Sequence, residues 1–455
     1  MKLFDDTIIG ISTALSKGAI SIIRLSGDDA IKIVNKVFKG IDLSKVEPNT
    51  INYGHIVDSD SCQIIDEVLV SIFKAPKSYT KEDVVEINCH GGLFVTNKIY
   101  EQLVLLGARP SEPGEFTKRA FLSGRIDLTK AEAVMDVINA ENNAALKIAN
   151  SALNGKISTF VDQKRQELLD IIATISVNID YPEYDDVEQL TNEDILPKLK
   201  TIKLELEDVL NNAKSAKLLK NGINTVIVGK PNVGKSSLLN TLIGENKAIV
   251  TNIPGTTRDI VEASINLGQV TLNLIDTAGI RITEDVVEKI GVEKSKEQIN
   301  KADIILCVLD GSEPINEQDK EILNEIKNKC HLTIINKIDL EQKINLGEVD
   351  DNVLFISTKN NNTIKELENK ILETLNLNNL FNKDITYISN ARQLEKINFA
   401  IKALDEALTT IENEATIDFV DIDIRKAWLY LGEIVGQTST DNLLDELFSK
   451  FCLGK

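Results

Sequence analysis

A glycine-rich octapeptide at 229–236 (G-K-P-N-V-G-K-S) carries the clearest chemical signal in the sequence. It fits the phosphate-binding pattern G-x-x-x-x-G-K-[ST] at every fixed position. An apolar, β-branched run precedes it, and a helical run closed by Gly244 follows it. In this strand–loop–helix context, backbone N–H groups and the helix N-terminus stabilise phosphate oxygens. We therefore expect Lys235 to reach the terminal phosphates and Ser236 to bind Mg²⁺, and we reject a chance glycine turn.

Further segments follow in the order typical of a guanine-nucleotide site. A threonine of P-G-T-T-R-D (254–259) can complete the Mg²⁺ shell, and D-T-A-G (276–279) offers an aspartate near Mg²⁺ and a glycine N–H for the terminal phosphate. Asp339, in N-K-I-D, can accept two hydrogen bonds from guanine, and S-T-K (357–359) would close over the base. Because each segment follows a predicted strand, we expect a doubly wound α/β sheet with guanine specificity.

The residue directly after the D-x-x-G glycine is Ile280, where many GTPases carry a glutamine that orients water. An isoleucine cannot polarise water. Glu284, Asp285 and Glu288 are therefore candidates for that task. No arginine finger is obvious in the sequence, so the charge that develops during hydrolysis needs another cation.

The whole chain has 455 residues, which predicts two or three domains. A net charge of −19 argues against binding nucleic acid by general electrostatics, so any RNA contact needs a local basic patch or a partner. The five cysteines form neither C-x-x-C pairs nor zinc spacings, which is typical of reduced thiols. Neither a signal peptide nor an 18-residue apolar run is visible, so we expect a soluble, cytoplasmic protein.

The first 120 residues predict a mixed α and β region with strands at 19–25, 67–73 and 83–89 and a helix at 93–106. Arg24 and Glu86 lie inside two of these strands. Each must pair, meet a ligand or face water, because burying either charge alone is costly. His90 is interpreted as a turn residue rather than a metal ligand.

Helical periodicity dominates the regions on both sides of the nucleotide domain. One run extends from 127 to about 180, and another from 195 to 219. After the nucleotide domain, three more are expected at 394–411, 422–435 and 441–451. Either these are two independent helical pieces, or they form one domain with the nucleotide domain inserted. We favour insertion, since neither half could bury its apolar stripe alone.

The chain carries C-L-G-K at 452–455, G-T-T-R-D at 255–259 and R-A-F-L at 119–122. Through these segments and its domain order, it resembles, over essentially its full length, the MnmE/TrmE family of tRNA modification GTPases. The resemblance implies a folate-binding and dimerising domain at 1–119, a helical domain in two parts at 120–220 and 381–455, and an inserted GTPase domain at 221–380.

The resemblance also implies how the missing cation is supplied. In this family the GTPase domains pair transiently across a homodimer, with K⁺ bound beside the nucleotide. The implied K⁺ ligands are Asn232, Thr251, Ile253 and Thr256, the middle two through backbone carbonyls; the implied Mg²⁺ ligands are Ser236 and Thr257. Glu288 matches the family's water-positioning glutamate, and the predicted catalytic residues are Glu288, Lys235 and Asp276.

Motifs and resemblance together define two sets of binding residues. The predicted GTP-binding residues are Asn232, Val233, Gly234, Lys235, Ser236, Ser237, Thr251, Asn252, Ile253, Pro254, Gly255, Thr256, Thr257, Asp276, Thr277, Ala278, Gly279, Asn336, Lys337, Asp339, Ser357, Thr358 and Lys359. The implied folate contacts are Arg24, Glu86, Arg125 and Lys455. Cys452 is either a participant in chemistry near the folate or a half-buried thiol.

By resemblance, the protein acts with an FAD-dependent partner of the MnmG/GidA type. The pair installs an aminomethyl or carboxymethylaminomethyl group on the wobble uridine of tRNA, using 5-formyl- or methylene-tetrahydrofolate. Two departures from the family stand out: its glycine- and proline-rich N-terminal loop is here S-T-A-L-S-K-G at 12–18, and Arg125 stands where some members carry lysine.

Two other classes of function are weighed against this one. A GTP-gated binding protein, such as a ribosome-assembly factor, would usually carry a basic RNA-binding appendage, and none is visible in the sequence. A folate-dependent enzyme could use GTP only for regulation. Loss of the wobble modification in a deletion strain, restored by the wild-type gene but not by Asp276→Ala, would separate the favoured hypothesis from both.

Overall fold

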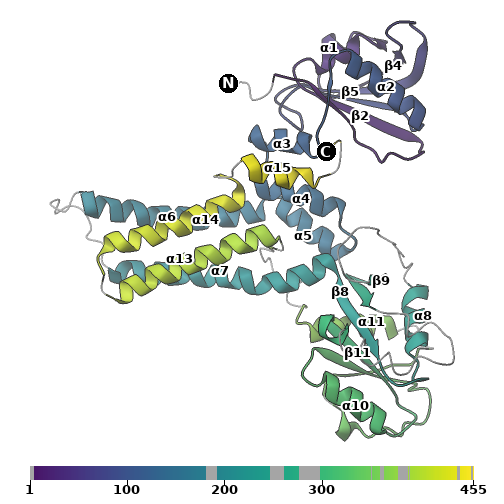
Figure 1. The fold of residues 1–455 in the computed structure, drawn as a ribbon, viewed down its shortest axis with the longest axis vertical. Coiled ribbons are helices and arrows are strands. Elements are labelled where there is room, and N and C mark those ends of the chain that lie inside the picture. Colours follow the sequence, from purple (N-terminus) through teal and green to yellow (C-terminus); the bar gives the residue numbers. More distant parts are fainter. Residues whose placement is uncertain are drawn as a thin grey trace. The chain divides into compact units, whose positions relative to one another are not determined.

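The computed structural model describes residues 5–180, 192–245, 261–275, 298–349, 351–358, 363–377, 388, 390–413, 415–437, 441–451 and 454. The chain divides into two compact units (Figure 1), one formed by Met1–Met135 with Leu431–Lys455 and the other by Asp136–Tyr430. The first unit therefore joins segments from far apart in the sequence.

The first unit contains a seven-stranded sheet with the order β3-β4-β5-β6-β2-β1-β7. Its pairs are antiparallel except for β1 with β7. The strands are β1 (Ile8–Ile11), β2 (Ile20–Ser26), β3 (Phe38–Lys39), β4 (Thr50–Val57), β5 (Ile64–Phe73), β6 (Val84–His90) and β7 (Arg109–Pro110). The predicted strands at 19–25, 67–73 and 83–89 are confirmed as β2, β5 and β6, whereas β1 and β4 were not predicted.

One face of this sheet is buried because apolar residues alternate along its strands. Ile23 and Leu25 of β2 and Val70 and Ile72 of β5 are fully buried on that face. Two helices cover it, α1 (Ala30–Asn35) and α2 (Leu93–Leu105), and the short 3₁₀ helix η1 (Leu43–Lys45) packs beside α1. The other face carries the polar strand residues, among them Arg24.

Three shorter helical elements complete the first unit: α3 (Glu115–Leu122), the start of α4 (Leu128–Ile138) and α15 (Asp441–Ser449). Leu128 of α4 packs against Phe448 and Phe451, which form a small core with Leu444. The aromatic rings of Phe448 and Phe451 lie 5.1 Å apart. The C-terminal helix predicted at 441–451 is thereby confirmed, and it packs on α3.

The second unit contains long helices and a second sheet. The helices outside the sheet-forming segment are α5 (Asn143–Leu153), α6 (Lys156–Asp180), α7 (Asn192–Asn221), α13 (Ala391–Glu412) and most of α14 (Ile417–Val435). α13 packs along α7, and Arg165 of α6 stacks on Trp428 of α14 with its guanidinium 4.2 Å from the ring centre. Because the helices flanking the sheet-forming segment pack on each other, the predicted insertion of one domain into the other is confirmed.

The second sheet has the order β13-β12-β11-β8-β10-β9, parallel except for the β9–β10 hairpin. Its strands are β8 (Ile223–Val228), β9 (Val261–Leu267), β10 (Val270–Ile275), β11 (Ile304–Asp310), β12 (His331–Asn336) and β13 (Val353–Phe355), with the 3₁₀ helix η2 (Leu346–Glu348) before β13. The doubly wound α/β class predicted from the motifs is confirmed.

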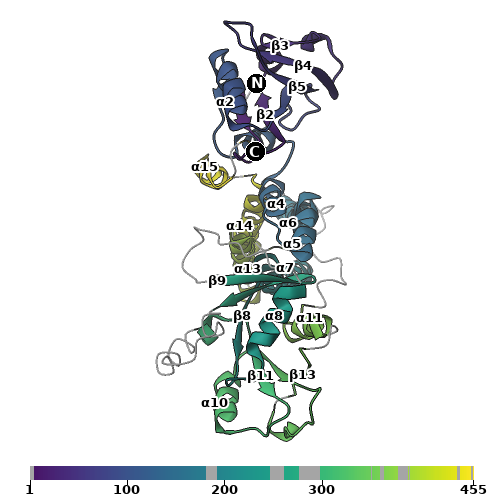
Figure 2. The ribbon, with the colours of Figure 1, turned by 90° about the vertical axis from the view of Figure 1, so that its right-hand side faces the viewer.

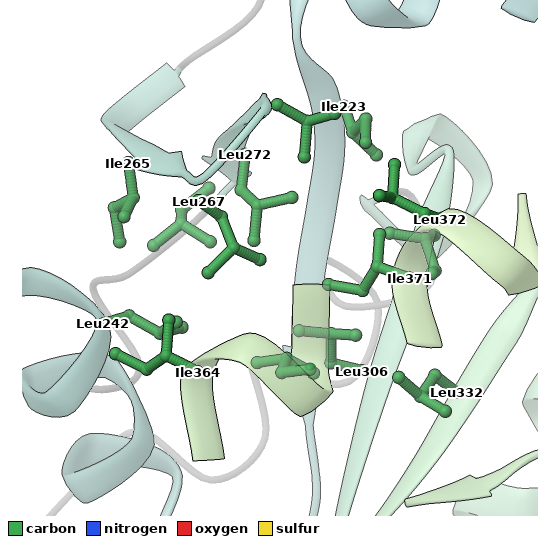
Figure 3. Packing of buried hydrophobic residues seen from close by; sticks show 14 of the residues in the cluster. Ile223, Leu242, Ile265, Leu267, Leu272, Leu306, Leu332, Ile364, Ile371 and Leu372 are labelled. Carbon is green, nitrogen blue, oxygen red and sulfur yellow. The ribbon is translucent and has the colours of Figure 1, made fainter. Parts of the chain in front are cut away.

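Helices cover both faces of this sheet. α8 (Lys235–Glu245) and α11 (Thr363–Thr374) share one apolar core with it, drawn in Figure 3, and Figure 2 shows both helices beside the strands. α10 (Glu317–Ile326) contributes Ile326 to a second core on the opposite side of β11. Gly244 lies inside α8, so the expectation that it closes this helix was wrong.

The helical run expected from 127 to about 180 is not one helix, because the structure divides it into α4, α5 and α6. At the first break, the side chain of Asn142 accepts the N–H of Ala145 at 2.7 Å and caps α5. At the second, Gly155 has φ +87°, a left-handed conformation that glycine adopts without strain. Local capping therefore overrides continuous apolar periodicity.

Candidate functional site

The glycine-rich loop connects β8 to α8 and closes around one lysine side chain. Gly229 (φ +149°), Asn232 (φ +62°) and Gly234 (φ +102°) all adopt positive φ. The Lys235 Nζ donates to the carbonyl oxygens of Gly229 at 2.6 Å and Lys230 at 2.7 Å. Burial lowers the pKa of Lys235 below its ordinary value. An anion bound in this loop would compensate that desolvation.

Asn336 joins the loop to the end of β12. Its Nδ2 donates to the Val233 carbonyl oxygen at 2.9 Å, and the side chain is 1% exposed. A Cβ atom on Gly234 would clash with the same Nδ2, so only glycine allows this approach. Two motifs more than 100 residues apart in sequence are therefore joined by a direct side-chain contact.

The remaining described residues of the base-recognition motifs gather at the same ends of the strands. Ser357 Oγ donates to Asp339 Oδ1 at 2.9 Å, and the Thr358 carbonyl accepts from Thr241 Oγ1 at 3.4 Å. Lys337, with φ +64°, places its Nζ 2.5 Å from Asp310 Oδ2. Since the hydroxyl of Ser357 orients the Asp339 carboxylate, the geometry suits recognition of a planar donor edge such as that of guanine.

Sequence reasoning missed two acidic residues that support this arrangement. Asp310 ends β11; burial would raise its pKa, but hydrogen bonds from Lys337 and Ser312 outweigh burial and hold it below the ordinary value. Asp319 accepts from Lys230 Nζ at 3.2 Å and also closes the N-terminus of α10 with Asn316. An aspartate directly after a fully apolar run was the available signal for Asp310.

Several predicted residues lie outside the described residues. These are Thr251, Asn252, Ile253, Pro254, Gly255, Thr256, Thr257, Asp276, Thr277, Ala278, Gly279, Glu288, Lys359, Cys452 and Lys455. The described part of the nucleotide site therefore consists of the glycine loop, with Ser236 and Ser237 in the first turn of α8, and the two base-recognition segments.

A second candidate site lies on the open face of the first unit's sheet. Arg24 and Glu86 are directly opposite each other on β2 and β6, and Arg24 Nε donates to Glu86 Oε1 at 2.8 Å. The Arg24 guanidinium lies near two rings, with its Cζ 5.6 Å from the centre of Phe116 and 5.8 Å from that of Tyr79. The sequence left open whether Arg24 and Glu86 pair, meet a ligand or face water. The structure shows that they pair with each other across the two strands.

Arg125 reaches the same aromatic side chain from another segment. Its Cζ lies 4.8 Å from the Tyr79 ring centre, so Tyr79 is in contact with both arginines. The Tyr79 hydroxyl is 3.0 Å from Thr117 Oγ1, and Thr117 is fully buried in α3. Three of the predicted residues, Arg24, Glu86 and Arg125, are thus brought together around a ring that the sequence did not single out.

The C-terminal segment also reaches this site. The Gly454 carbonyl oxygen accepts from Ser12 Oγ at 3.0 Å and from the Arg24 guanidinium at 3.3 Å. Thr13 Oγ1 accepts from the Ile22 N–H at 3.2 Å, which ties the divergent loop to β2. The loop at 12–18 therefore supports the C-terminal segment beside Arg24.

His90, expected in a turn, is the last residue of β6. Its Nδ1 lies 2.7 Å from Asp66 Oδ1, and this hydrogen bond raises the pKa of His90.

The described cysteines, Cys62, Cys89, Cys307 and Cys330, are free thiols. No helix in the described part of the chain is both long and apolar enough to cross a membrane.

Comparison with known proteins gives matches along the whole chain. A family model described as GTP-binding protein TrmE N-terminus matches residues 7–125, and one described as MnmE helical domain matches residues 128–452. The tRNA modification GTPases MnmE of Bacillus cytotoxicus and Bacillus mycoides are 50% and 49% identical to the present chain over 455 residues, with 99% of each chain covered.

Among solved structures, a single-residue variant of Aquifex aeolicus Era bound to GDP.AlF4⁻ is 31% identical, covering 40% of this chain and 66% of that one, with a TM-score of 0.26. The G domain of the T. maritima FeoB iron transporter is 27% identical, covering 33% of this chain and 98% of that one, also with a TM-score of 0.26.

Proposed function

Because the chain belongs to the MnmE family of tRNA modification GTPases, we propose that it couples K⁺-dependent GTP hydrolysis to modification of the wobble uridine of tRNA in the cytoplasm. The modification would be a 5-carboxymethylaminomethyl or aminomethyl group built with a tetrahydrofolate one-carbon unit and a flavin-dependent partner of the MnmG/GidA type. The observation that carries the proposal is the contact of Asn336 with Val233, which joins the guanine-recognition motif to the phosphate loop.

Nucleotide binding follows from the chemistry of the loop. Lys235 provides a buried ammonium for the terminal phosphates, and the first turn of α8 provides backbone N–H groups and the positive end of the helix dipole. Asp339 would accept the two guanine N–H groups, which adenine cannot present. These features support a guanine nucleotide as the ligand.

The residues present also fit the two cations. The Ser236 hydroxyl, in the first turn of α8, and the Asn232 amide, exposed at the left-handed turn of the loop, are hard oxygen donors of the kind that Mg²⁺ and K⁺ take. Bound there, the cations would stabilise the negative charge that develops on the phosphates during hydrolysis. The proposed ligands are Ser236 and Thr257 for Mg²⁺, and Asn232, Thr251, Ile253 and Thr256 for K⁺.

In the proposed mechanism, Glu288 positions the attacking water and Asp276 supports the Mg²⁺ shell, while Lys235 stabilises the terminal phosphates. The test is steady-state GTP hydrolysis in K⁺ and in Na⁺ at equal ionic strength. We expect a much faster reaction in K⁺. Equal rates would contradict the assignment of Asn232, whereas Glu288→Ala should slow turnover and leave nucleotide affinity intact.

The first unit supports the folate part of the proposal. Arg24 and Glu86 form a charge-assisted pair that could bind the donor and acceptor edge of a pterin, and the adjoining rings of Tyr79 and Phe116 provide flat apolar surface. Arg125 and Lys455 would complete the site. Titration of the purified protein with 5-formyltetrahydrofolate should give saturable binding that Glu86→Gln weakens; binding that Glu86→Gln does not affect would contradict this assignment.

The same sheet supports the proposed homodimer. Its open face carries exposed apolar side chains: Ile51 is 68% exposed and Tyr53 61%, next to Leu69 directly opposite Tyr53. Monomeric proteins rarely expose contiguous apolar patches of this kind. Sedimentation equilibrium should show a dimer that Tyr53→Glu dissociates, and a monomeric wild type would contradict the proposal.

We retain the domain assignment 1–119, 120–220, 221–380 and 381–455 as part of the proposal. The decisive cellular experiment is deletion of the gene followed by analysis of tRNA nucleosides. Loss of the wobble modification, restored by the wild-type gene but not by Asp276→Ala, would support the proposal. Retained modification would favour a ribosome-assembly factor, and restoration by Asp276→Ala would favour a folate enzyme that uses GTP only for regulation.

A further inference from the structure

A pocket of about 440 Å³ lies beside the Arg24–Glu86 pair, where the end of β5, the following loop and the turn between α3 and α4 meet. It is lined by Phe73, Pro76, Lys77, Ser78, Tyr79, Lys81 and Arg125. Three of these seven residues are cationic and none is acidic, although the whole chain has a net charge of −19. The pocket is therefore a local concentration of positive charge with an aromatic wall.

The loop that presents the two lysines is held in place from within. Ser78 Oγ donates to the Glu82 carbonyl oxygen at 2.5 Å, and Thr80, only 1% exposed, lies 2.7 Å from Ser26 Oγ. The Glu82 carboxylate in turn accepts from Arg119 at 3.1 Å. Because buried groups fix the loop, Lys77 and Lys81 project from a defined backbone.

The three cations of the pocket keep their charge available. Lys81 Nζ donates to the Ser123 carbonyl oxygen at 3.0 Å, which directs the ammonium towards the segment of Arg125 without neutralising it. Within the part of the chain that the structure describes, none of Lys77, Lys81 and Arg125 forms an ion pair with a carboxylate. An anion entering the pocket would therefore meet three uncompensated positive charges.

The pocket is continuous with the candidate site around Arg24. Tyr79 belongs to both, since its ring contacts Arg24 and also lines the pocket. Arg125 likewise lines the pocket and stacks on Tyr79. A ligand bound at Arg24 could extend past this ring towards Lys77 and Lys81.

We propose that this pocket binds the γ-linked glutamate tail of folate, so that the protein prefers polyglutamylated folates to the monoglutamate. The inference rests on the proposed folate function and deepens it. A pterin bound at Arg24 and Glu86 leaves a carboxylate-bearing tail to be placed, and each further γ-glutamate adds one carboxylate. Lys77 and Lys81 supply matching charges at the side of the site where such a tail would leave.

The tail of a small molecule is favoured over the phosphates of RNA because of the surroundings of the lysines. The charges lie in a pocket that shares a wall with the Arg24 site, and they do not form a stripe along one face. Exposed pairs of opposite charge are individually weak, so two lysines predict an affinity gain of about three- to tenfold for a long tail.

The experiment is a calorimetric titration of the full-length protein with the mono- and pentaglutamates of 5-formyltetrahydrofolate. The measured quantity is the ratio of the two dissociation constants, which reports only on the tail beyond its first glutamate. We expect a ratio of about three to ten for the wild type, falling towards one as salt is raised. The double variant Lys77→Gln, Lys81→Gln should have a ratio near one.

Two matched variants act as controls. Lys77→Arg with Lys81→Arg keeps the charge and should keep the wild-type ratio. Lys39→Gln removes a positive charge from the edge strand β3, which contributes no residue to the pocket, and should also keep it. A general loss of positive charge therefore cannot imitate the expected result.

Equal affinities of the wild type for both folates would overturn the tail subsite while leaving the folate proposal standing. Binding of neither folate would overturn the folate proposal and the subsite with it. If the glutamine double variant kept the wild-type ratio but bound tRNA more weakly, the pocket would be a contact for RNA phosphates, and the inference would be wrong.

Discussion

Replacing Arg119 with methionine should destabilise the first unit by about 3 kcal/mol at neutral pH. The Arg119 side chain is 1% exposed and donates to Asp6 Oδ1 at 2.6 Å, to Glu82 Oε1 at 3.1 Å and to Glu115 Oε1 at 3.1 Å. These contacts join the segment before β1, the loop before β6 and helix α3. Methionine fills a similar volume but carries no charge, so Asp6, Glu82 and Glu115 lose the cation that they share.

The magnitude follows from the burial of the partners. Breaking a buried ion pair by removing one member typically costs about 3–5 kcal/mol. The lower end applies here because Asp6 is 42% exposed and Arg109 still pairs with both Asp6 and Glu115. Glu82 loses its cation, although Ser26 Oγ still donates to it at 2.6 Å.

The effect should also depend on pH. Burial would raise the pKa values of Asp6 and Glu115, but hydrogen bonds from Arg109 and Arg119 outweigh burial and lower both. A lowered folded-state pKa contributes stability above the unfolded value of about 4, and that stability is lost as pH falls through the folded value. The difference between wild type and Arg119→Met should therefore be largest near pH 7 and shrink below about pH 4.

Hydrogen exchange of the β2 and α3 amides, corrected for intrinsic rates, measures this loss of stability directly. A loss of about 3 kcal/mol corresponds to roughly a hundredfold faster exchange at pH 7. Lys118→Met, on the same helix, removes an exposed pair with Asp445 and should change exchange less than about fivefold. A difference between wild type and Arg119→Met that stays constant from about pH 7 to about pH 3.5 would refute the electrostatic reasoning and point to packing.

Three further substitutions test the second unit. Gly234→Ala places a Cβ against Asn336 Nδ2 at φ +102° and should weaken GTP binding at least about tenfold, measured with a fluorescent nucleotide; unchanged affinity would contradict the described loop. Asp339→Asn should shift preference from GTP towards XTP in competition binding, and no shift would remove the guanine assignment. Asn142→Ala removes the cap of α5 and should cost about 1–2 kcal/mol in thermal unfolding, whereas an unchanged melting temperature would contradict that cap.

The nucleotide site was predictable where its elements are local in sequence. β8, the glycine loop and the start of α8 are adjacent in sequence, so the apolar pattern and the glycine motif predicted them together. The central strand β11 was missed although Ile304–Asp310 is buried throughout. A run without alternation carries no strand periodicity, and only its length and the aspartate at its end mark it.

Contacts between distant segments could not be predicted. The facing of Arg24 and Glu86 depends on the antiparallel register of two strands that lie 62 residues apart, and a shift by one residue would turn one side chain to the other face. Tyr79 escaped notice for the same reason, since its loop shows only turn residues. Its place in the candidate site depends on contacts with Arg24 and Arg125, which lie on other segments of the chain.

The hydrogen bond from Arg24 to the Gly454 carbonyl spans 430 residues of sequence, and this separation sets an order of events during synthesis. At about 5–20 residues per second, a ribosome needs roughly 20–90 s to add that many residues. The N-terminal sheet can form early, but the surroundings of Arg24 stay incomplete until the GTPase segment and the last helices have left the ribosome. A nascent chain therefore completes its GTPase segment before it can complete the surroundings of Arg24.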